Sequence, residues 1–321
     1  MFGKKDSTPA LPGASGGTNE NQILRDLAAT YARELKWRRI FKFVFLGLIV
    51  WYFIAVFRMA DTSATSIATP HTALVELSGP IGLNIGVSAD QINQSLRDAF
   101  AAKMSKAVVL RIDSPGGTPV QSAEINAEIT RLREEYPQKP FHVVIGELCA
   151  SGGYYVAVAG DKIFANPASI VGSIGVRMDS FGFVDTMQKL GIERRTLTAG
   201  ENKALLDPFA PRDAAQVAHL QSMLDDVHQQ FIDAVKNGRG DRLSGDADVF
   251  SGLVWSGAQA KDIGLIDDFG SLESVARNVI GVEKIVDYSY QAGFLEQFSK
   301  DFGVSVGMGI AQSLGLDLQI K

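Results

Sequence analysis

Between His71 and about Tyr290, short apolar runs alternate with amphipathic segments, and this alternation restricts the fold more than any other feature of the chain. Runs rich in β-branched residues predict buried strands, whereas apolar residues every three or four positions predict helices. The predicted strands are Ala73–Leu77, Ala107–Ile112, Val143–Ile145 and Lys162–Ala165, and the predicted helices are Asp90–Ala102, Val120–Glu135 and about Arg212–Lys236. This order of elements predicts an α/β domain with a mainly parallel sheet.

The composition excludes several kinds of partner and site. The chain has 321 residues and a net charge of -5, and no basic block dominates the α/β region, so we do not expect a nucleic-acid partner. The single cysteine, Cys149, excludes an intrachain disulfide framework and a multi-cysteine zinc site. None of the four histidines lies at a metal-ligand spacing from another; they are His71, His142, His219 and His228.

An apolar run near the N-terminus predicts a transmembrane anchor. The uncharged stretch from Phe43 to Phe57 is 15 residues long, and the span reaches the ~20 residues of a bilayer crossing only when it extends from Ile40 to Ala60. Lys42 then lies near one end, where its long stem can reach the interface. A cleaved signal peptide is disfavoured by the long segment before the run, and a buried soluble helix by its apolar character on all sides.

Charges beside this run predict its orientation and complete the division of the chain. Five basic residues precede the run and one follows it, so the N-terminus is expected in the cytoplasm and the α/β domain outside; they are Arg33, Lys36, Arg38, Arg39 and Lys42, against Arg58. The predicted parts are a cytoplasmic segment (1–36), an anchor (37–60), a tether (61–70), the α/β domain (71–290) and a C-terminal tail of unknown role (291–321).

Two segments contain a candidate nucleophile and a candidate base. Ser151 lies where the strand Val143–Ile145 gives way to a small-residue helix, and a helix N-terminus favours negative charge. Lys203 lies in the segment Gly200–Ala204. A lysine that acts as a base at pH 7 needs a pKa roughly two to three units below ~10.4, which burial achieves. Each residue also has a structural explanation. The small residues around Ser151 are typical of a helix that packs closely on a sheet, and Lys203 is compatible with an ordinary solvated surface charge.

A third segment, Asp113–Thr118, follows a predicted strand and contains a Pro-Gly-Gly turn. The N–H groups of Gly116 and Gly117 are free of side chains and can approach a reacting carbonyl, although a plain tight turn explains the same residues. Cys149 is expected to be a small buried hydrophobe rather than a nucleophile. A carboxylate pair among Asp179, Asp185 and Asp207 is a weaker alternative for acid–base chemistry.

Together these segments resemble the signal peptide peptidase A family of membrane-bound Ser-Lys peptidases. The resemblance covers roughly residues 72–280, and the motifs that carry it are Asp113–Gly117, Ala150–Tyr154, Asp161–Ala165, Ile170–Val176, Gly200–Lys203 and Gly264–Asp267. It implies a ClpP/crotonase-type fold with Ser151 as nucleophile and Lys203 as general base and then acid. It also implies an oxyanion hole of Gly152 with Gly116 or Gly117, and Ser173 as the hydroxyl that orients the lysine.

The resemblance further implies a serine endopeptidase without metal or cofactor. Its expected substrates are remnant signal peptides and other unfolded hydrophobic peptides at the outer face of a bacterial inner membrane. It implies a homo-oligomeric ring or dome, and it leaves open whether the serine and the lysine of one dyad come from two different subunits. Two alternatives stay open: a crotonase-type acyl-CoA enzyme, which needs no serine nucleophile, and a catalytically inactive membrane scaffold of the same fold.

Overall fold

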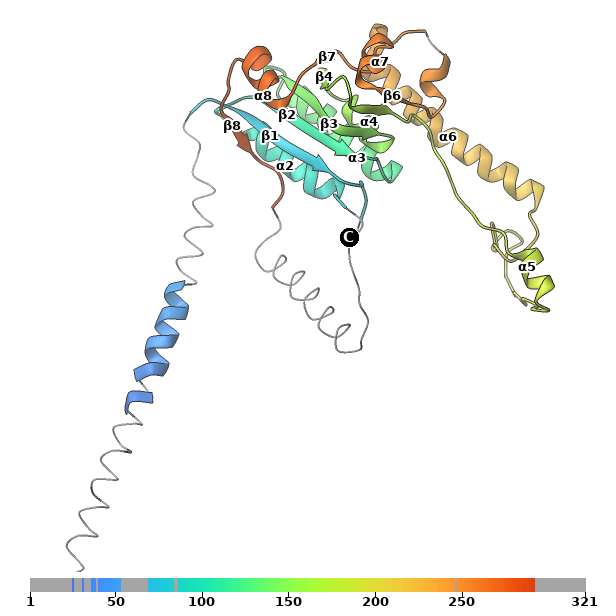
Figure 1. Cartoon of the computed structure of the whole chain (residues 1–321), viewed down its shortest axis with the longest axis horizontal. Coiled ribbons are helices and arrows are strands. Elements are labelled where there is room, and N and C mark those ends of the chain that lie inside the picture. The colour runs from blue at the N-terminus through green and yellow to red at the C-terminus, as the bar shows by residue number, and fades with distance from the viewer. Residues whose placement is uncertain are drawn as a thin grey trace, which may run out of the picture. The chain divides into compact units, whose positions relative to one another are not determined.

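The computed structural model describes residues 25, 31, 36–38, 40–52, 69–83, 86–245 and 247–291. The chain divides into two compact units, residues 1–67 and residues 68–321, which are described separately. Figure 1 shows the elements of both units along the chain. The predicted tail, most of the tether and most of the N-terminal segment lie outside the described residues.

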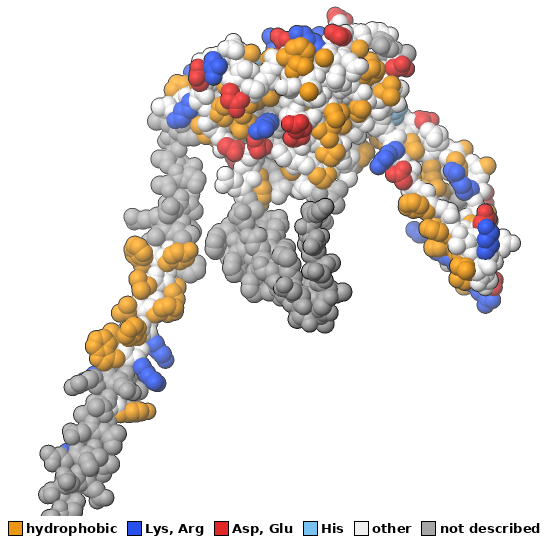
Figure 2. Space-filling model, viewed as in Figure 1, with side chains coloured by type: hydrophobic (Ala, Val, Ile, Leu, Met, Phe, Trp, Pro, Cys, Tyr) orange, Lys and Arg blue, Asp and Glu red, His pale blue; other side chains and the backbone are white. Residues whose placement is uncertain are grey.

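In the first unit, residues 36–38 and 40–52 are helical, and their large apolar side chains are exposed (Figure 2). Residues 53–60 of the predicted anchor lie outside the described residues. Among the residues that are described, no helix has both the length and the apolar character that a bilayer crossing requires. The anchor over residues 37–60 therefore stays a prediction.

The second unit is built on a mainly parallel sheet, as predicted. Its eight described strands are β1 (His71–Ser78), β2 (Ser105–Ser114), β3 (Phe141–Ala150), β4 (Lys162–Ala165), β5 (Ile170–Gly172), β6 (Val254–Ser256), β7 (Asp268–Phe269) and β8 (Ile285–Asp287). The order is β6-β5-β3-β2-β1-β8, with β4 beside β3 and β7 beside β4. The pairing of β5 with β6 is antiparallel, and the other strand pairs are parallel.

Helices connect these strands and cover the sheet. They are α2 (Ala89–Ala101), α3 (Pro119–Glu135), α4 (Gly152–Ala157), α5 (Val184–Lys189), α6 (Ala214–Arg239), α7 (Gly257–Asp262) and α8 (Leu272–Val275), with short 3₁₀ turns η2 (Gly240–Arg242) and η3 (Ala247–Phe250) and a π-helical turn η4 (Ala276–Ile280). The fold is therefore α/β, with crossover helices between parallel strands.

Two apolar layers hold the sheet from its two faces. Helices α2 and α3 supply the main core with residues spaced three or four apart, which places them on one side of each helix; these are Ile92, Leu96, Ala99 and Phe100 from α2 and Ile125, Ile129 and Leu132 from α3. On the opposite face, α8 packs Leu272 and Val275 against Val109 and Val144. Burial of a large apolar side chain contributes about 1.5–3 kcal/mol, so this double layer is the main source of stability.

Strand β3 extends well past the predicted Val143–Ile145 and ends directly before Ser151. The pairing of β2 with β3 is irregular between Ile112 and Ser114, where the Asp113 carboxylate accepts a hydrogen bond from Leu148 N–H at 3.2 Å. This carboxylate replaces a backbone partner and lets the strand continue through polar residues. Local hydrophobicity gives no signal for that continuation, so the sequence analysis ended the strand too early.

Helix α6 begins and ends two to three residues later than predicted. Asp213 is its N-cap, and the carboxylate accepts the Gln216 N–H at 2.9 Å. At the other end the buried Arg239 guanidinium donates to Gly264 C=O at 2.8 Å and pairs with Asp267 at 2.8 Å. These contacts fix the C-terminal end of α6 on the sheet, while α5 and the first turns of α6 extend away from it (Figure 1).

Candidate active site

Ser151 occupies the turn between β3 and α4 in a strained backbone conformation. Its φ is 51° and its ψ is −122°, values that a residue with a side chain rarely adopts. Its N–H donates to Gly172 C=O at 2.8 Å, and its own C=O accepts the Tyr155 N–H at 3.0 Å. The neighbouring Ala150 and Gly152 are buried, whereas Ser151 is partly exposed. The turn therefore presents the hydroxyl at the surface of a closely packed strand–helix junction.

Gly116 lies against this turn at a distance that excludes any side chain. A Cβ on Gly116 would lie 2.7 Å from Gly152 N and 2.7 Å from Ser151 Cβ, and the φ of Gly116 is +98°. Both the space and the backbone angle therefore require glycine here. The Pro-Gly-Gly segment and the Ser-Gly-Gly segment meet at this point, as the sequence analysis expected.

Of the two glycines in the loop, Gly117 has the available N–H group. Gly116 N–H already donates to Ser114 Oγ at 3.1 Å. Gly116 C=O accepts Ile81 N–H at 2.8 Å, and because the peptide unit is planar and trans, Gly117 N–H points to the opposite side. A Cβ on Gly152 would lie 3.0 Å from Gly117 N, so that nitrogen lies beside the first residue of α4.

The N–H of Gly152 is the second candidate donor. Gly152 is the first residue of α4, and the first N–H groups of a helix have no partner within the helix. Together with Gly117 N–H it can bind a negatively charged oxygen that forms beside Ser151. The geometry thus favours Gly117 over Gly116 as the partner of Gly152 in an oxyanion hole.

Ser173 lies beside Ser151 at the end of β5. It follows Gly172, whose C=O accepts the Ser151 N–H, and its own N–H donates to Leu253 C=O at 2.7 Å. Its φ is 52°, a second strained value next to the same turn. The structure therefore brings five of the six predicted site residues together, namely Ser151, Gly152, Gly116, Gly117 and Ser173.

Lys203, the sixth, lies far from Ser151 within one chain. Its neighbour Asn202 accepts a hydrogen bond from the Gln216 side chain at 3.1 Å, which places the lysine segment beside the first turn of α6. The surroundings of Ser151 instead contact the middle of α6, where His228 Nε2 and Ile174 C=O are 3.1 Å apart. His228 lies more than three turns beyond Gln216, roughly 18 Å at about 1.5 Å per residue. Lys203 is also exposed, not buried as a base requires.

The carboxylates closest to Lys203 in sequence do not neutralise it. Asp207 is buried and pairs with the Arg194 guanidinium, which stands over the Phe209 ring at 4.9 Å. Within the described part of the chain, neither Asp207 nor Glu201 forms an ion pair with Lys203. An ion pair would favour the charged form of the lysine, and a base must be neutral, so the lack of such a pair among these residues is compatible with a base.

A cavity of about 940 Å³ lies beside the lysine segment. Its lining comes from residues 178–182 and from residues 204–224, and its apolar members include Phe181, Leu206, Val217, Leu220 and Leu224. The apolar stripe of α6 has two different surroundings. Phe231 and Val235 are buried, whereas the first half of the same stripe lines this cavity. The helical period is the same in both halves, so the sequence pattern does not separate them.

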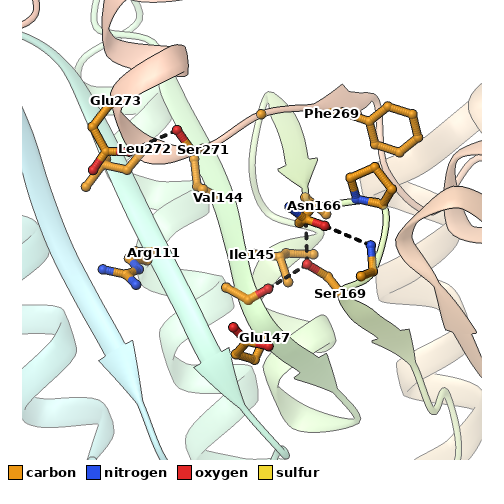
Figure 3. A pocket seen from close by; sticks show the side chains of 15 residues that line it. Arg111, Val144, Ile145, Glu147, Asn166, Ser169, Phe269, Ser271, Leu272 and Glu273 are labelled. Carbon is orange, nitrogen blue, oxygen red and sulfur yellow. Dashed lines mark hydrogen bonds between the residues drawn. The ribbon is translucent and has the colours of Figure 1, made fainter.

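A second cavity, of about 600 Å³, is shown in Figure 3, and its lining includes none of the predicted site residues. It occupies the fork where β3 leaves β4 after Val144 and joins β5 at Leu148. The buried Ser169 hydroxyl donates to Gly146 C=O at 2.6 Å and so satisfies a carbonyl inside this fork. The cavity thus exists because β3 pairs first with β4 and then with β5, which leaves a gap between those two strands.

Cys149 is the buried hydrophobe that the sequence analysis predicted. Its side chain has no exposed surface, and burial together with the nearby Asp113 charge raises the pKa of the thiol far above its usual value. The thiolate is the reactive form of cysteine. Cys149 is therefore unsuited to act as the nucleophile two residues before Ser151.

Comparisons with known proteins identify the family of this chain. The model of peptidase family S49 matches residues 133–284, a range that includes Ser151, Ser173 and Lys203. The "Putative protease MJ0651" of Methanocaldococcus jannaschii is 33% identical over 217 residues, which are 65% of this chain and 67% of that protein. The chain belongs to peptidase family S49.

Other relatives of this S49 chain are longer than the region they share with it. "Serine protease SPPA, chloroplastic" of Arabidopsis thaliana is 31% identical over 205 residues, 62% of this chain and 29% of that protein. A protein of Brucella abortus named "Na(+)/H(+) antiporter NhaA" is 40% identical over 262 residues, 79% of this chain and 35% of its own length. This S49 chain thus spans about a third of the Brucella protein, whose name describes that protein as a whole.

Proposed function

We propose that this S49 chain is a membrane-anchored serine endopeptidase with a ClpP/crotonase-type fold. Ser151 attacks the peptide carbonyl, and Lys203 first accepts the serine proton and then donates it to the leaving amine. The resulting acyl-enzyme is hydrolysed by water. Ser173 orients the lysine amine, and no metal or cofactor takes part.

The observation that carries this proposal is the meeting of two backbone donors at the Ser151 turn. Gly117 N lies close to Gly152, since a Cβ on Gly152 would lie 3.0 Å from it. We propose that the two N–H groups bind the tetrahedral oxygen together, and each such donor contributes roughly 2.7–4 kcal/mol to the transition state in other hydrolases. Among the described residues neither N–H group has another hydrogen-bond partner, so both are available to a tetrahedral oxygen beside the strained serine.

The distance between Ser151 and Lys203 within a chain supports assembly of the site from two copies. The lysine segment is at one end of α6, and Ser151 is beside the middle of that helix. We propose a homo-oligomeric ring or dome in which Lys203 of one subunit reaches Ser151 of the next. Closure of a ring requires head-to-tail contacts, which such an arrangement provides.

The proposed location is a bacterial inner membrane, with the N-terminus in the cytoplasm and the α/β domain outside. The apolar residues 40–52 and the basic residues before them support this orientation. The proposed substrates are remnant signal peptides and other unfolded hydrophobic peptides, which arise at that surface. A tethered site would meet them by diffusion along the membrane.

Peptide hydrolysis by the full-length protein in detergent tests this proposal. Hydrolysis of apolar peptides, followed by mass spectrometry, should fall roughly 10⁴-fold or more in Ser151→Ala and in Lys203→Ala. A serine-directed covalent probe should label Ser151 and leave Ser151→Ala unlabelled. Lys189→Ala, which removes an exposed lysine from α5, is the matched control and should retain activity.

Several results would contradict the proposal. Labelling that persists in Ser151→Ala would remove that serine as the nucleophile. A lysine base must be neutral, so the rate of the wild type should rise toward alkaline pH. Unchanged hydrolysis in Lys203→Ala, or a wild-type rate that does not rise toward alkaline pH, would remove the lysine as the base. Turnover of acyl-CoA substrates that does not depend on Ser151 would favour the crotonase-type alternative, and a protein inactive in all of these assays would favour a scaffold.

A further inference from the structure

Ser114, the last residue of β2, contacts both the Pro-Gly-Gly loop and the Ser-Gly-Gly turn of the candidate site. Its side chain is 0% exposed, and in the sheet it pairs with Cys149, two residues before Ser151. A Cβ on Gly153 would lie 3.3 Å from Ser114 Cβ, so the serine packs directly under the glycines of the Ser-Gly-Gly turn. Its Oγ accepts the hydrogen bond of Gly116 N–H at 3.1 Å.

This hydrogen bond fixes one end of a short chain of peptide groups. Gly116 is held at its N–H by Ser114 and at its C=O by Ile81 N–H, at 2.8 Å. Thr118 N–H donates back to Ile81 C=O at 2.9 Å. Between these anchors, the orientation of Gly117 N–H follows from the planarity of the peptide unit. Glycine has no intrinsic preference for its φ of +98° at position 116, so the anchors must supply it.

We propose that Ser114 is a positioning residue whose hydroxyl oxygen holds the Gly116–Gly117 peptide with Gly117 N–H directed at the oxyanion beside Ser151. This inference rests on the proposed peptidase function. Ser114 is fully buried and acts through Gly116, without contact with the reacting atoms of the substrate. The role is separate from the hydrophobic packing of β2, because alanine would preserve the packing and remove only the acceptor.

The kinetics of Ser114→Ala test this role. Without the acceptor, the Gly116 peptide is free to turn, and kcat should fall roughly 10- to 100-fold, as small misplacements of catalytic groups do, while KM changes less than about twofold. The affinity for a peptide aldehyde, whose tetrahedral adduct uses the oxyanion hole, should fall by the same factor as kcat/KM. Ser114→Thr keeps the hydroxyl and should recover most of kcat.

Ser95→Ala is the matched control. Ser95 is also a buried serine, but its hydroxyl donates to Gln91 C=O within α2. This variant should match Ser114→Ala in thermal midpoint to within a few degrees and retain the wild-type kcat. Full kcat in Ser114→Ala, a loss carried by KM instead of kcat, or a Ser114→Thr variant as slow as Ser114→Ala would each overturn the proposal.

Hydrogen exchange provides a readout that does not depend on activity. In Ser114→Ala the amides of Gly116 and Gly117 should exchange faster, whereas in Ser95→Ala they should exchange as in the wild type. Unchanged exchange at these amides in Ser114→Ala would overturn the proposal by itself. If the wild type shows no Ser151-dependent hydrolysis, the peptidase proposal fails, and the exchange measurement still decides whether Ser114 holds the loop.

Discussion

At the scale of single residues, backbone strain coincides with the candidate site. Three residues other than glycine have positive φ in the described part of the chain, namely Ser151 at 51°, Ser173 at 52° and Leu206 at 56°. Two lie next to each other at the ends of β3 and β5, and the third follows Lys203 by three positions. Each costs about 1–3 kcal/mol and persists only where the surroundings enforce it. The strained residues therefore include Ser151 and Ser173, and the third lies just after the segment that contains Lys203.

Gly116→Ala tests the close approach of the two loops. The added Cβ would lie 2.7 Å from Gly152 N and would also place alanine at φ +98°. We expect a loss of stability of about 2–4 kcal/mol from strain and overpacking, and a fall in hydrolysis of at least about 100-fold because the oxyanion donors move apart. Chemical denaturation and peptide hydrolysis measure these two effects.

Gly281→Ala is the control for Gly116→Ala, because it introduces backbone strain without a close contact. Gly281 also has a positive φ, +78°, but an added Cβ would meet nothing within 4 Å. This variant should lose about 1 kcal/mol and keep its activity. An equal loss of activity in both variants would show that general destabilisation, not the geometry of the Gly116 contact, is responsible.

At the scale of elements, helices α2 and α3 are joined by charges at their surface. Glu128 on α3 pairs with Arg97 on α2 at 2.7 Å and with Arg131 at 2.8 Å. The hydrogen bond from Arg131 lowers the pKa of Glu128 to about 2, against an opposing effect of partial burial and with a further contribution from Arg97. These helices support the Pro-Gly-Gly loop, which ends where α3 begins at Pro119.

Glu128→Gln should weaken this connection in a pH-dependent way. The folded-state pKa lies below the unfolded value, so the carboxylate stabilises the fold fully above about pH 4.5 and loses this effect as the pH falls toward about 2. We expect a loss of about 1 kcal/mol or less at pH 7, which shrinks between pH 4.5 and pH 2. Urea denaturation across this range measures it.

The control for this prediction is Glu124→Gln on the same helix. The Glu124 carboxylate accepts a hydrogen bond from the Gln121 amide at 3.1 Å, where the replacement conserves shape. Its effect should be smaller at pH 7 than that of Glu128→Gln. A Glu128→Gln penalty that stays constant from pH 7 to pH 3 would show that the interaction does not depend on the charge of the carboxylate.

At the scale of the whole molecule, α6 links two regions that the proposed chemistry needs together. Its C-terminal end is fixed to the sheet by Arg239 and Asp267, and its first turn contacts the segment that contains Lys203. A helix of this length is stiff, so the lysine cannot approach Ser151 of the same chain without a large rearrangement. The proposed neighbouring copy would supply the lysine without that rearrangement.

Mixed assemblies test whether the dyad forms between copies. Ser151→Ala and Lys203→Ala chains, each inactive alone, should regain activity when they are coexpressed. If each site takes its serine and its lysine from different chains, random mixing should restore about a quarter of the wild-type activity per site. A double variant, Ser151→Ala with Lys203→Ala, coexpressed with either single variant is the control and should remain inactive.

No activity in the mixture would contradict completion of the dyad between subunits, provided that isolated assemblies contain both chains. Mass spectrometry of the intact assemblies establishes that composition. Full recovery at low subunit concentration, where assemblies dissociate, would also contradict it, because the sites should then be lost together with the assembly.

The order of elements, the exposed serine turn and the glycine-rich loop follow from the sequence because each depends on nearby residues. Apolar runs rich in β-branched residues predict β1 to β4, stripes of period three to four predict α2, α3 and α6, and Ser151 is found at the predicted junction. The short elements β5 to β8, α5, α7 and α8 are not predicted. Cys149 is buried because it lies on a central strand. The anchor, the oligomer and the dyad stay predictions.

Other features depend on contacts between distant segments, and only the tertiary structure decides them. The extension of β3 to Ala150 needs the Asp113 carboxylate from β2, and the choice of Gly117 over Gly116 needs the hydrogen bonds to Ser114 and Ile81. The remote position of Lys203 follows from how Arg239 and Asp267 anchor α6. Hydropathy predicts which side chains are buried. The hydrogen-bond partners of backbone and charged groups depend instead on which distant segments the tertiary structure brings together.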